Sequence, residues 1–203
     1  MPRLVNAILL VALSLLLSSR SGFNDVCASR QKPQSRIIFQ LLSVDNCSGK
    51  PGHFEIKNSS AVRTSKGDNL INCAMENYGE AKLLSRLDIS ITACRDGISH
   101  NTCESFSAWK FPAGVCTLAT SDNTPWASVI KAIRPPFRCP FKAGKYTLAN
   151  GTVNVDAIIR IAGSQIDLLM NRIWVPELRV YNEKQDLHIC FKVSCSFARS
   201  RIQ

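Results

Sequence analysis

The stretch Leu187–Phe197, LHICFKVSCSF, decides the fold class. Its apolar residues alternate with more polar ones, and this period of two is typical of a β-strand with one buried face. The same alternation recurs over residues 87–93 and 153–161. Three separate segments with a strand period predict a chain dominated by β structure.

Further strands are predicted over residues 36–44, 54–56 and 172–181. The last of these changes phase around Pro176, where we expect a bulge or an edge position, because proline lacks the N–H that a central strand needs. Residues 182–186 have the composition of a hairpin turn that leads into the final strand.

One segment has a helical period. Thr124 can cap a helix and Pro125 suits its first position, whereas Pro135 and Pro136 would end it. Apolar residues follow the cap at i, i+3, i+4 and i+7, namely Trp126, Val129, Ile130 and Ile133. We expect one short amphipathic helix, which either seals the core or covers the mouth of a cavity; the periodicity alone favours the core.

The N-terminus has the pattern of a secretory signal peptide. A positive charge precedes the apolar run from Ala7 to Leu17, and this run is shorter than the roughly 20 residues that a membrane-spanning helix needs. Small residues suited to cleavage end at Ser21 and at Ala28. We therefore expect residues 1–21, or as many as 28, to be removed, and a single domain over residues 36–203.

Nine cysteines follow or adjoin this leader, and they indicate disulfides formed in the secretory pathway. Their spacing alone does not select a connectivity. Metal binding is not expected, because no Cys-x-x-Cys pair occurs and the histidines, His53, His100 and His188, are far apart in the sequence. We expect those histidines at the surface.

Three glycosylation sequons begin at Asn46, Asn58 and Asn150. Glycosylation would place these asparagines on the surface. Asn46 is the weakest candidate, because the middle residue of its sequon is Cys47, itself a candidate for a disulfide.

The chain is basic, with 25 Lys and Arg against 15 Asp and Glu. Such a charge favours anionic partners such as acidic lipids, sialylated glycans or nucleic acid. The basic residues are scattered and do not alternate with aromatic ones, so we expect no nucleic-acid partner.

Motifs of catalysis are not found in the sequence. It contains no Gly-x-Ser-x-Gly, no His-Glu-x-x-His and no glycine-rich phosphate loop. The sequence therefore predicts a protein that is not an enzyme and that carries no cofactor.

Large apolar side chains gather in the middle third of the chain, in segments rich in turn residues. Either they pack into the core, or they surround a cavity and contact lipid or a membrane. The sequence pattern alone leaves both interpretations open. The residues concerned are Phe106, Trp109, Phe111, Trp126, Ile130, Ile133 and Phe137.

Two motifs resemble the ganglioside activator family and its arthropod relatives. The first is Ser43–Cys47, SVDNC, and the second, more specific one is Cys139–Leu148, CPFKAGKYTL. In that family a Cys-Pro-Phe-Lys-x-Gly-x-Tyr-x-Leu segment opens the C-terminal strands, and Asp-Asn-Cys opens the domain. The resemblance extends over residues 41–197.

The resemblance implies a set of disulfides: Cys47–Cys190, Cys94–Cys103 and Cys116–Cys139. The chain departs from the family at Phe137, which stands where one half of the family's fourth bridge would lie. Cys73 and Cys195 have no counterparts in the family, so they are candidates for a substitute bridge. Cys27 is left over.

The resemblance also implies a β-cup fold, related to the MD-2-related lipid-recognition sandwich, with an apolar cavity for acyl chains. Such proteins extract a glycolipid and present it to a glycosidase, or transfer lipid between membranes. The implied partners are therefore a lipid or glycolipid, a membrane surface contacted transiently, and a glycosidase or receptor, in a secreted or lysosomal location. The alternative is a secreted interaction module that docks through its basic surface.

Candidate residues for the lipid cavity are apolar side chains of the middle and C-terminal thirds. They are Trp109, Phe111, Trp126, Val129, Ile130, Ile133, Leu168, Leu169 and Trp174.

Overall fold

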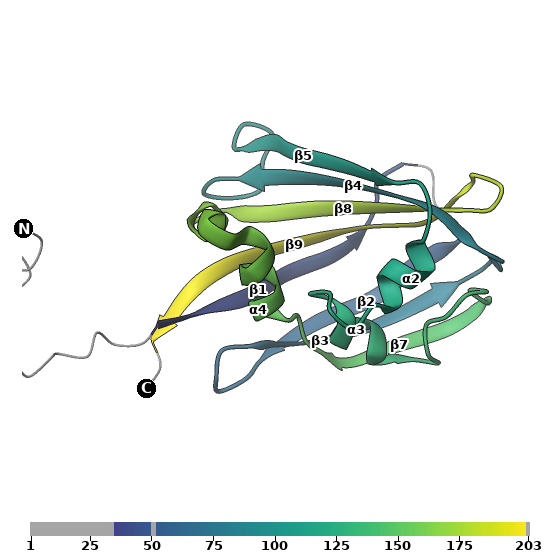
Figure 1. Ribbon diagram of the computed structural model, residues 1–203, viewed down its shortest axis with the longest axis horizontal. Coiled ribbons are helices and arrows are strands. Elements are labelled where there is room, and N and C mark those ends of the chain that lie inside the picture. Colours follow the sequence, from purple (N-terminus) through teal and green to yellow (C-terminus); the bar gives the residue numbers. More distant parts are fainter. Residues whose placement is uncertain (1–34, 50–51, 202–203) are drawn as a thin grey trace, which may run out of the picture. The chain divides into compact units, whose positions relative to one another are not determined.

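Two antiparallel β-sheets face each other in the computed structural model, which describes residues 35–49 and 52–201 (Figure 1). The larger sheet has the order β1 (Ser35–Asn46), β9 (Leu187–Arg201), β8 (Ile173–Asn182), β4 (Leu84–Cys94) and β5 (Cys103–Phe111). The smaller has the order β2 (Phe54–Arg63), β3 (Asn69–Asn77), β7 (Gly144–Gly151) and β6 (Ile133–Arg134). The predicted all-β sandwich is confirmed.

The hairpin turn between β8 and β9 is also confirmed. The side-chain oxygen Oδ1 of Asn182 accepts hydrogen bonds from the backbone N–H groups of Lys184 and Asp186. An asparagine side chain that bonds the backbone ahead of it replaces part of the turn's own hydrogen bonding.

The expectation for Pro176 is wrong. Strand β8 is central in its sheet, and Pro176 lies opposite Ile91 of β4, while the register shift in β8 falls between Val180 and Tyr181. A proline is tolerated here because the pairing of β8 with β9 is interrupted between Trp174 and Glu177, where the missing N–H would otherwise be needed.

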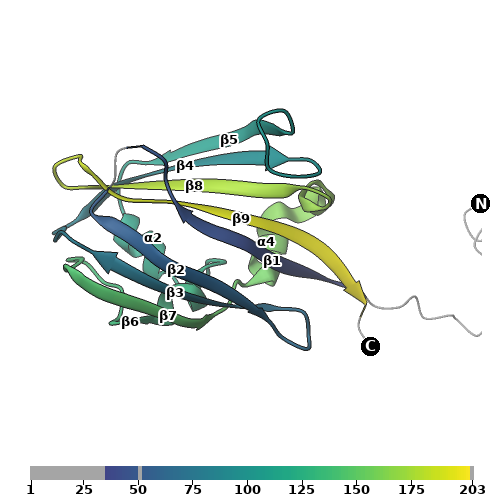
Figure 2. The ribbon, with the colours of Figure 1, turned by 180° about the vertical axis from the view of Figure 1, so that it is seen from behind.

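Helices lie on one side of the sandwich, as Figure 1 shows, and Figure 2 shows β1 and β2 on the other side. They are α2 (Val115–Thr120), α3 (Ala127–Lys131), α4 (Val155–Ala162) and the 3-10 helix η1 (Gly163–Leu169). The sequence predicts one helix, so this count is wrong for the described part of the chain. None of the helices in that part is long and apolar enough to cross a membrane.

The strand predicted over residues 153–161 is helix α4. Its N-cap is Asn154, whose Oδ1 accepts a hydrogen bond from the N–H of Ala157 at 3.0 Å. Asp156 in the first turn and Arg160 in the last turn have the charges that a helix dipole favours at each end. These local signals outweigh the alternation of apolar residues, which fits both periods over so short a segment.

The predicted helix after Thr124 is present as α3, but it is shorter than expected. Its N-cap position is Trp126, and the Thr124 hydroxyl donates to the carbonyl of Ser121 rather than capping the helix. Ile133 leaves the helix and pairs with Leu148 as part of β6.

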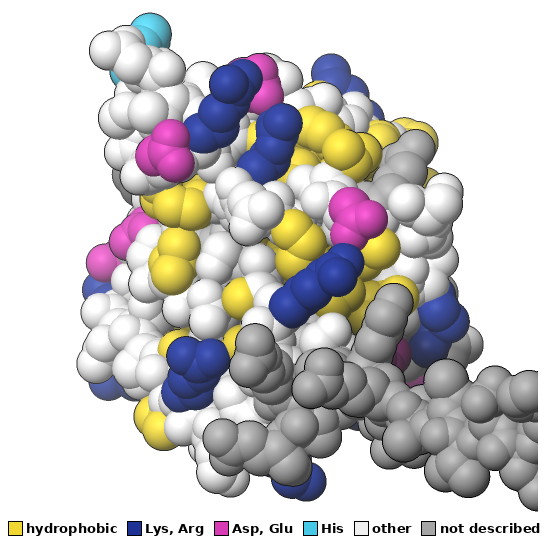
Figure 3. Space-filling view, turned by 90° about the vertical axis from the view of Figure 1, so that its left-hand side faces the viewer, with side chains coloured by type: hydrophobic (Ala, Val, Ile, Leu, Met, Phe, Trp, Pro, Cys, Tyr) yellow, Lys and Arg dark blue, Asp and Glu magenta, His cyan; other side chains and the backbone are white. Residues whose placement is uncertain are grey.

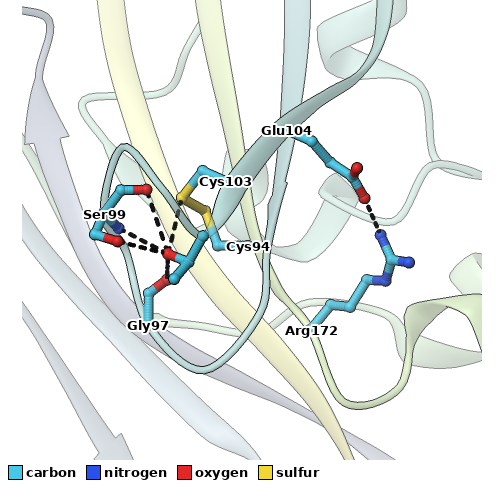
Figure 4. The surroundings of a disulfide bond; sticks show 7 residues. Cys94, Gly97, Ser99, Cys103, Glu104 and Arg172 are labelled. Atoms are coloured by element: carbon cyan, nitrogen blue, oxygen red, sulfur yellow. Dashed lines mark hydrogen bonds and ion pairs between the residues drawn. A yellow bond between two sulfur atoms is a disulfide. The ribbon is translucent and has the colours of Figure 1, made fainter.

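All three disulfides that the resemblance implies are present. They join Cys47 to Cys190, Cys94 to Cys103 and Cys116 to Cys139. Such bonds indicate an oxidising compartment. The second bond closes the β4–β5 hairpin, whose turn is further held by the Thr102 hydroxyl, bonded to the carbonyl of Gly97 (Figure 4).

The predicted Cys73–Cys195 bridge is wrong, because both residues are free thiols. Cys73 lies on β3 and Cys195 on β9, so they belong to different sheets. Facing sheets are about 10 Å apart, whereas disulfides need Cα atoms within about 7 Å.

The predicted signal peptide, its cleavage site and Cys27 lie outside the described residues. The boundaries of the single domain over residues 36–203 remain a prediction.

Candidate functional site

The inward face of the five-stranded sheet consists of apolar rows that run across the strands. In one row, Leu87 pairs with Val180 and Phe111, and Val180 pairs with Ile189. Residues directly opposite each other in antiparallel strands point to the same face. The whole row therefore faces the second sheet.

A second row runs parallel to the first, two residues along each strand. Ile89 pairs with Leu178 and Trp109, and Leu178 pairs with Phe191. This row crosses four of the five strands and consists only of large apolar side chains. Like the first row, it forms a continuous apolar surface on the inward face.

Burial differs between the rows. Leu87, Val180 and Ile189 are buried, whereas Ile89, Leu178 and Phe191 are only half-buried. A third row, built from Ala93, Trp174 and Cys195, is buried again. The middle of the sheet thus keeps solvent-accessible apolar surface between two closed ends.

The opposing sheet shows the same pattern. Met75 and Cys73 of β3 pack against the core but stay half-buried, whereas their neighbours Ile71 and Leu148 are buried. The sheets approach each other most closely where β1 and β9 contact β2 and β3. The accessible apolar surface therefore belongs to the interior, away from the closed edge.

Two hollows open at the end of the sandwich near α4 and η1. The first has a volume of about 690 Å³, and its apolar lining is Met170, Ile173, Phe197 and Ala198. The second, of about 520 Å³, lies between the start of β1, the β2–β3 hairpin and the start of α4. Figure 3 shows this end, where apolar side chains appear between scattered basic and acidic ones.

The polar lining of the first hollow is balanced in charge. It contains Arg172 and Arg199 together with Asp96 and Asp167. Arg199 is bound to Asp167 at 2.7 Å, and Arg172 is bound to Glu104 of β5 at 2.9 Å (Figure 4). Neither guanidinium is a free positive charge, so this hollow is less basic than the chain as a whole.

The structure separates the predicted cavity residues into three groups. Ile133 and Trp174 are buried in the core, while Trp109, Trp126 and Leu168 are exposed by 47%, 37% and 51%. The others are half-buried against the core: Phe111, Val129, Ile130 and Leu169. Trp109 and Phe111 share the inward face with Trp174, but none of the nine lines either hollow. Their contact with lipid remains a prediction.

The inward rows contain residues that the predicted cavity set leaves out: Ile89, Leu178, Phe191, Met75 and Cys73. The signal for two of them is in the sequence, because the alternation in residues 87–93 and 187–197 already assigns Ile89 and Phe191 to the buried face. Large apolar side chains that are only half-buried thus occur on the strands of both sheets as well as in the loops.

The expectation of surface histidines is wrong for His188. This side chain is 0% exposed and lies beside His53, with ring centroids 5.4 Å apart. Burial lowers the pKa of His188, and the neighbouring His53 lowers it further. His53 and His100 are exposed, as predicted.

The asparagine side chains of the three sequons differ in their hydrogen bonding. Asn58 and Asn150 are exposed. The Asn46 side chain is engaged, because it donates to the carbonyl of Ile56 at 2.9 Å and accepts from the N–H of the same residue at 2.8 Å. Cys47 beside it is bridged. Glycosylation at Asn58 and Asn150 remains a prediction.

Comparison with known proteins adds one finding on structure. No family model matches the chain, and no curated protein matches it. Among solved structures it is similar to chicken MD-1 in complex with lipid IVa, with 9% identity and a TM-score of 0.26, over 80% of this chain and 98% of that chain. A likeness of this size carries no argument about function.

Proposed function

We propose that this protein binds lipid by taking acyl chains between its two sheets, and that it transfers or presents the lipid without chemical change. The observation that carries the proposal is the half-buried middle row of Ile89, Leu178 and Phe191, which faces the half-buried Met75 and Cys73. A sandwich that filled its own core would bury its middle most completely.

The driving force for such binding is the hydrophobic effect. Each CH₂ group moved from water to an apolar site contributes about 0.8 kcal/mol, so a long acyl chain is the natural ligand of a wide apolar interior. The head group would stay near the polar end, where Arg172, Arg199, Asp96 and Asp167 line the first hollow.

The cysteines support the same proposal. The resemblance to the ganglioside activator family implies three specific bonds, and the structure contains all three. The spacing of the cysteines alone does not select them. On this basis we extend the family's role to the chain: a secreted or lysosomal carrier of a lipid or glycolipid, with transient membrane contact and a glycosidase or receptor as partner.

A binding role without catalysis agrees with the lining of the hollows. Among the described residues that line them there is no histidine and no cysteine, so no nucleophile with an adjacent imidazole base meets a ligand there.

The test is displacement of a fluorescent fatty acid from the purified protein. Trp109→Glu and Phe191→Glu each place a charge on the middle row, and each should weaken binding by about tenfold to a hundredfold, the equivalent of about 1.5–3 kcal/mol of lost apolar contact. Trp109 is 47% exposed on an edge strand, so this variant should fold even if Phe191→Glu does not.

The matched control is Val62→Glu, which places the same charge on the outward face of β2, where Val62 is 56% exposed. It should bind the probe like the unaltered protein. Equal binding by Trp109→Glu and Val62→Glu would overturn the proposed site, provided that both variants unfold at the same temperature as the unaltered protein.

A further inference from the structure

His188 is a buried polar side chain whose ring nitrogens form no hydrogen bond with the described residues. It is 0% exposed, and neither Nδ1 nor Nε2 has a hydrogen-bond partner among the described residues. It lies just after the β8–β9 turn, at the end of the sandwich opposite α4 (Figure 1). Buried imidazoles without partners are rare in folded proteins, because the lost hydration is not replaced.

A second imidazole lies directly beside it. The His53 and His188 rings have centroids 5.4 Å apart and planes tilted by 37°. His53 is exposed and stands just before β2, so the pair consists of one buried and one exposed ring. Two residues that are far apart in the sequence thus form one pair of imidazoles.

The glycines around the pair lie close to the ring of His53 and to the backbone of His188. A Cβ atom on Gly79 would lie 3.0 Å from Nδ1 of His53, and one on Gly52 would lie 2.6 Å from the carbonyl oxygen of His188. Both glycines have ordinary negative or extended φ values, so the reason for glycine here is space. The His53 carbonyl also accepts a hydrogen bond from the Tyr78 N–H at 2.7 Å, which fixes the same loop.

The ring separation suits a shared metal ion. Zinc bonds an imidazole nitrogen at about 2.0–2.1 Å, and two rings coordinated at a tetrahedral angle have centroids about 5 Å apart. The observed 5.4 Å falls at this value. Burial favours the neutral form of His188, and the neutral imidazole is the form that coordinates metal.

The neighbouring groups also favour a cation. The carboxylate of Glu183 in the β8–β9 turn acts on His188 with a field that stabilises positive charge. Asn77, whose Nδ2 donates to the carbonyl of Gly79 at 2.6 Å, has an Oδ1 atom that is buried without a partner among the described residues. Phe141 closes another side, with its ring centroid 5.9 Å from that of His188.

We propose that His53 and His188 together bind a divalent transition-metal ion of the zinc class, with water in the remaining coordination positions. The site joins the start of β2 to the start of β9, so an ion there would tie the two sheets together beside the Cys47–Cys190 disulfide. It is separate from the proposed lipid site, and neither proposal depends on the other.

Isothermal titration of the untagged protein with Zn²⁺ tests the site. The unaltered protein should bind one ion per chain, and His53→Ala should lower the affinity by about 100-fold or more, because the loss of a group that only orients a metal ligand already costs about 10- to 100-fold. His53 is exposed, so this variant should fold. Gly79→Ala should also weaken binding, because the added methyl group displaces the His53 ring.

His100→Ala is the matched control, since His100 is an exposed histidine on the β4–β5 hairpin, at the other end of the sandwich. It should bind Zn²⁺ like the unaltered protein. The proposal is overturned if the unaltered protein binds no Zn²⁺, if His53→Ala binds it equally well, or if binding is lost on removal of His100 instead.

Discussion

At the scale of single residues, the two free thiols carry a direct chemical consequence. Burial raises the pKa of Cys73 to about 11 and that of Cys195 to about 12. The thiolate is the reactive form, so both residues should be inert at neutral pH while the protein is folded. The packing of the core thus keeps both thiols protonated in the folded protein.

We predict that iodoacetamide at pH about 8 leaves Cys73 and Cys195 unmodified in the folded protein and alkylates both after denaturation without reductant. Burial raises both pKa values far above that pH, whereas an unfolded cysteine, with a pKa of about 8.5, has an appreciable thiolate fraction there. Peptide mass spectrometry reads each residue separately. A Cys73–Cys195 crosslinked peptide would contradict the structure, and so would alkylation in the folded state.

A second prediction at this scale concerns the cap of α4. Asn154→Ala removes the hydrogen bond to the Ala157 N–H and should lower the free energy of unfolding by about 1 kcal/mol. Urea denaturation measures the change. The control is Asn101→Ala on the β4–β5 hairpin, where the exposed asparagine bonds no other described residue. An equal effect of both changes would show that the cap contributes nothing.

The positions of some single residues could not be predicted from the sequence. The polarity of His188 predicts the surface, and only the structure shows that residues from the starts of two distant strands enclose it. The engaged side chain of Asn46 depends on Ile56 of β2 in the same way. Contacts between distant segments leave no local pattern in the sequence.

At the scale of elements, the main error in the predicted secondary structure is helix α4, whose segment the sequence predicts to be a strand. Val155, Ala157 and Ile159 alternate as in a strand, but Val155, Ile158 and Ile159 also fit one helical face. The deciding signals are Asn154 before the segment and Gly163 after it, which are typical of a helix cap at each end. Those signals are local, so a closer comparison of caps could have found this helix.

The disulfides allow a prediction at the same scale. In the chain-entropy description, the Cys47–Cys190 bond closes a separation of 143 residues and the Cys94–Cys103 bond one of only 9. Replacing both cysteines by alanine should therefore cost about 5 kcal/mol for the first bond and about 2.7 kcal/mol for the second. Urea denaturation of the two double variants compares them.

The order of these two losses is the informative result. If the short hairpin bond proved the more important, stabilisation would come from contacts in the folded state, and loop entropy would not explain it.

At the scale of the whole molecule, the strand period predicts a chain dominated by β structure, because alternation over long strands directly reports which face is buried. The two-sheet sandwich follows from the family resemblance instead. The half-buried middle of the interior is not predictable in this way. It depends on the distance between the two sheets. That distance depends on the contacts of β1 and β9 with the smaller sheet at one edge and on the helices at the other.

The distribution of charge also belongs to this scale. On the outward face of the large sheet, Glu177 forms ion pairs with Lys192 at 3.1 Å and with Arg179 at 2.6 Å, so these two basic side chains are partly neutralised. Docking through a basic surface would weaken steeply with salt, because surface charges are screened. Burial of acyl chains is not screened in this way.

We predict that uptake of lipid from phosphatidylcholine vesicles changes less than about threefold between about 0.05 and 0.5 M NaCl, since the Debye length falls strongly over this range while apolar burial is preserved. Sedimentation of the vesicles, followed by lipid analysis of the supernatant, measures the uptake. A loss of uptake by more than tenfold would favour the interaction module with its basic surface.

Native mass spectrometry of the purified protein, after incubation with mixed vesicles of phospholipid and glycolipid, tests the central claim most directly. A protein that takes acyl chains between its sheets should carry one bound lipid per chain, and organic solvent should release that lipid for identification. A chain that stays free of phospholipid, glycolipid and fatty acid under all these conditions would contradict the account.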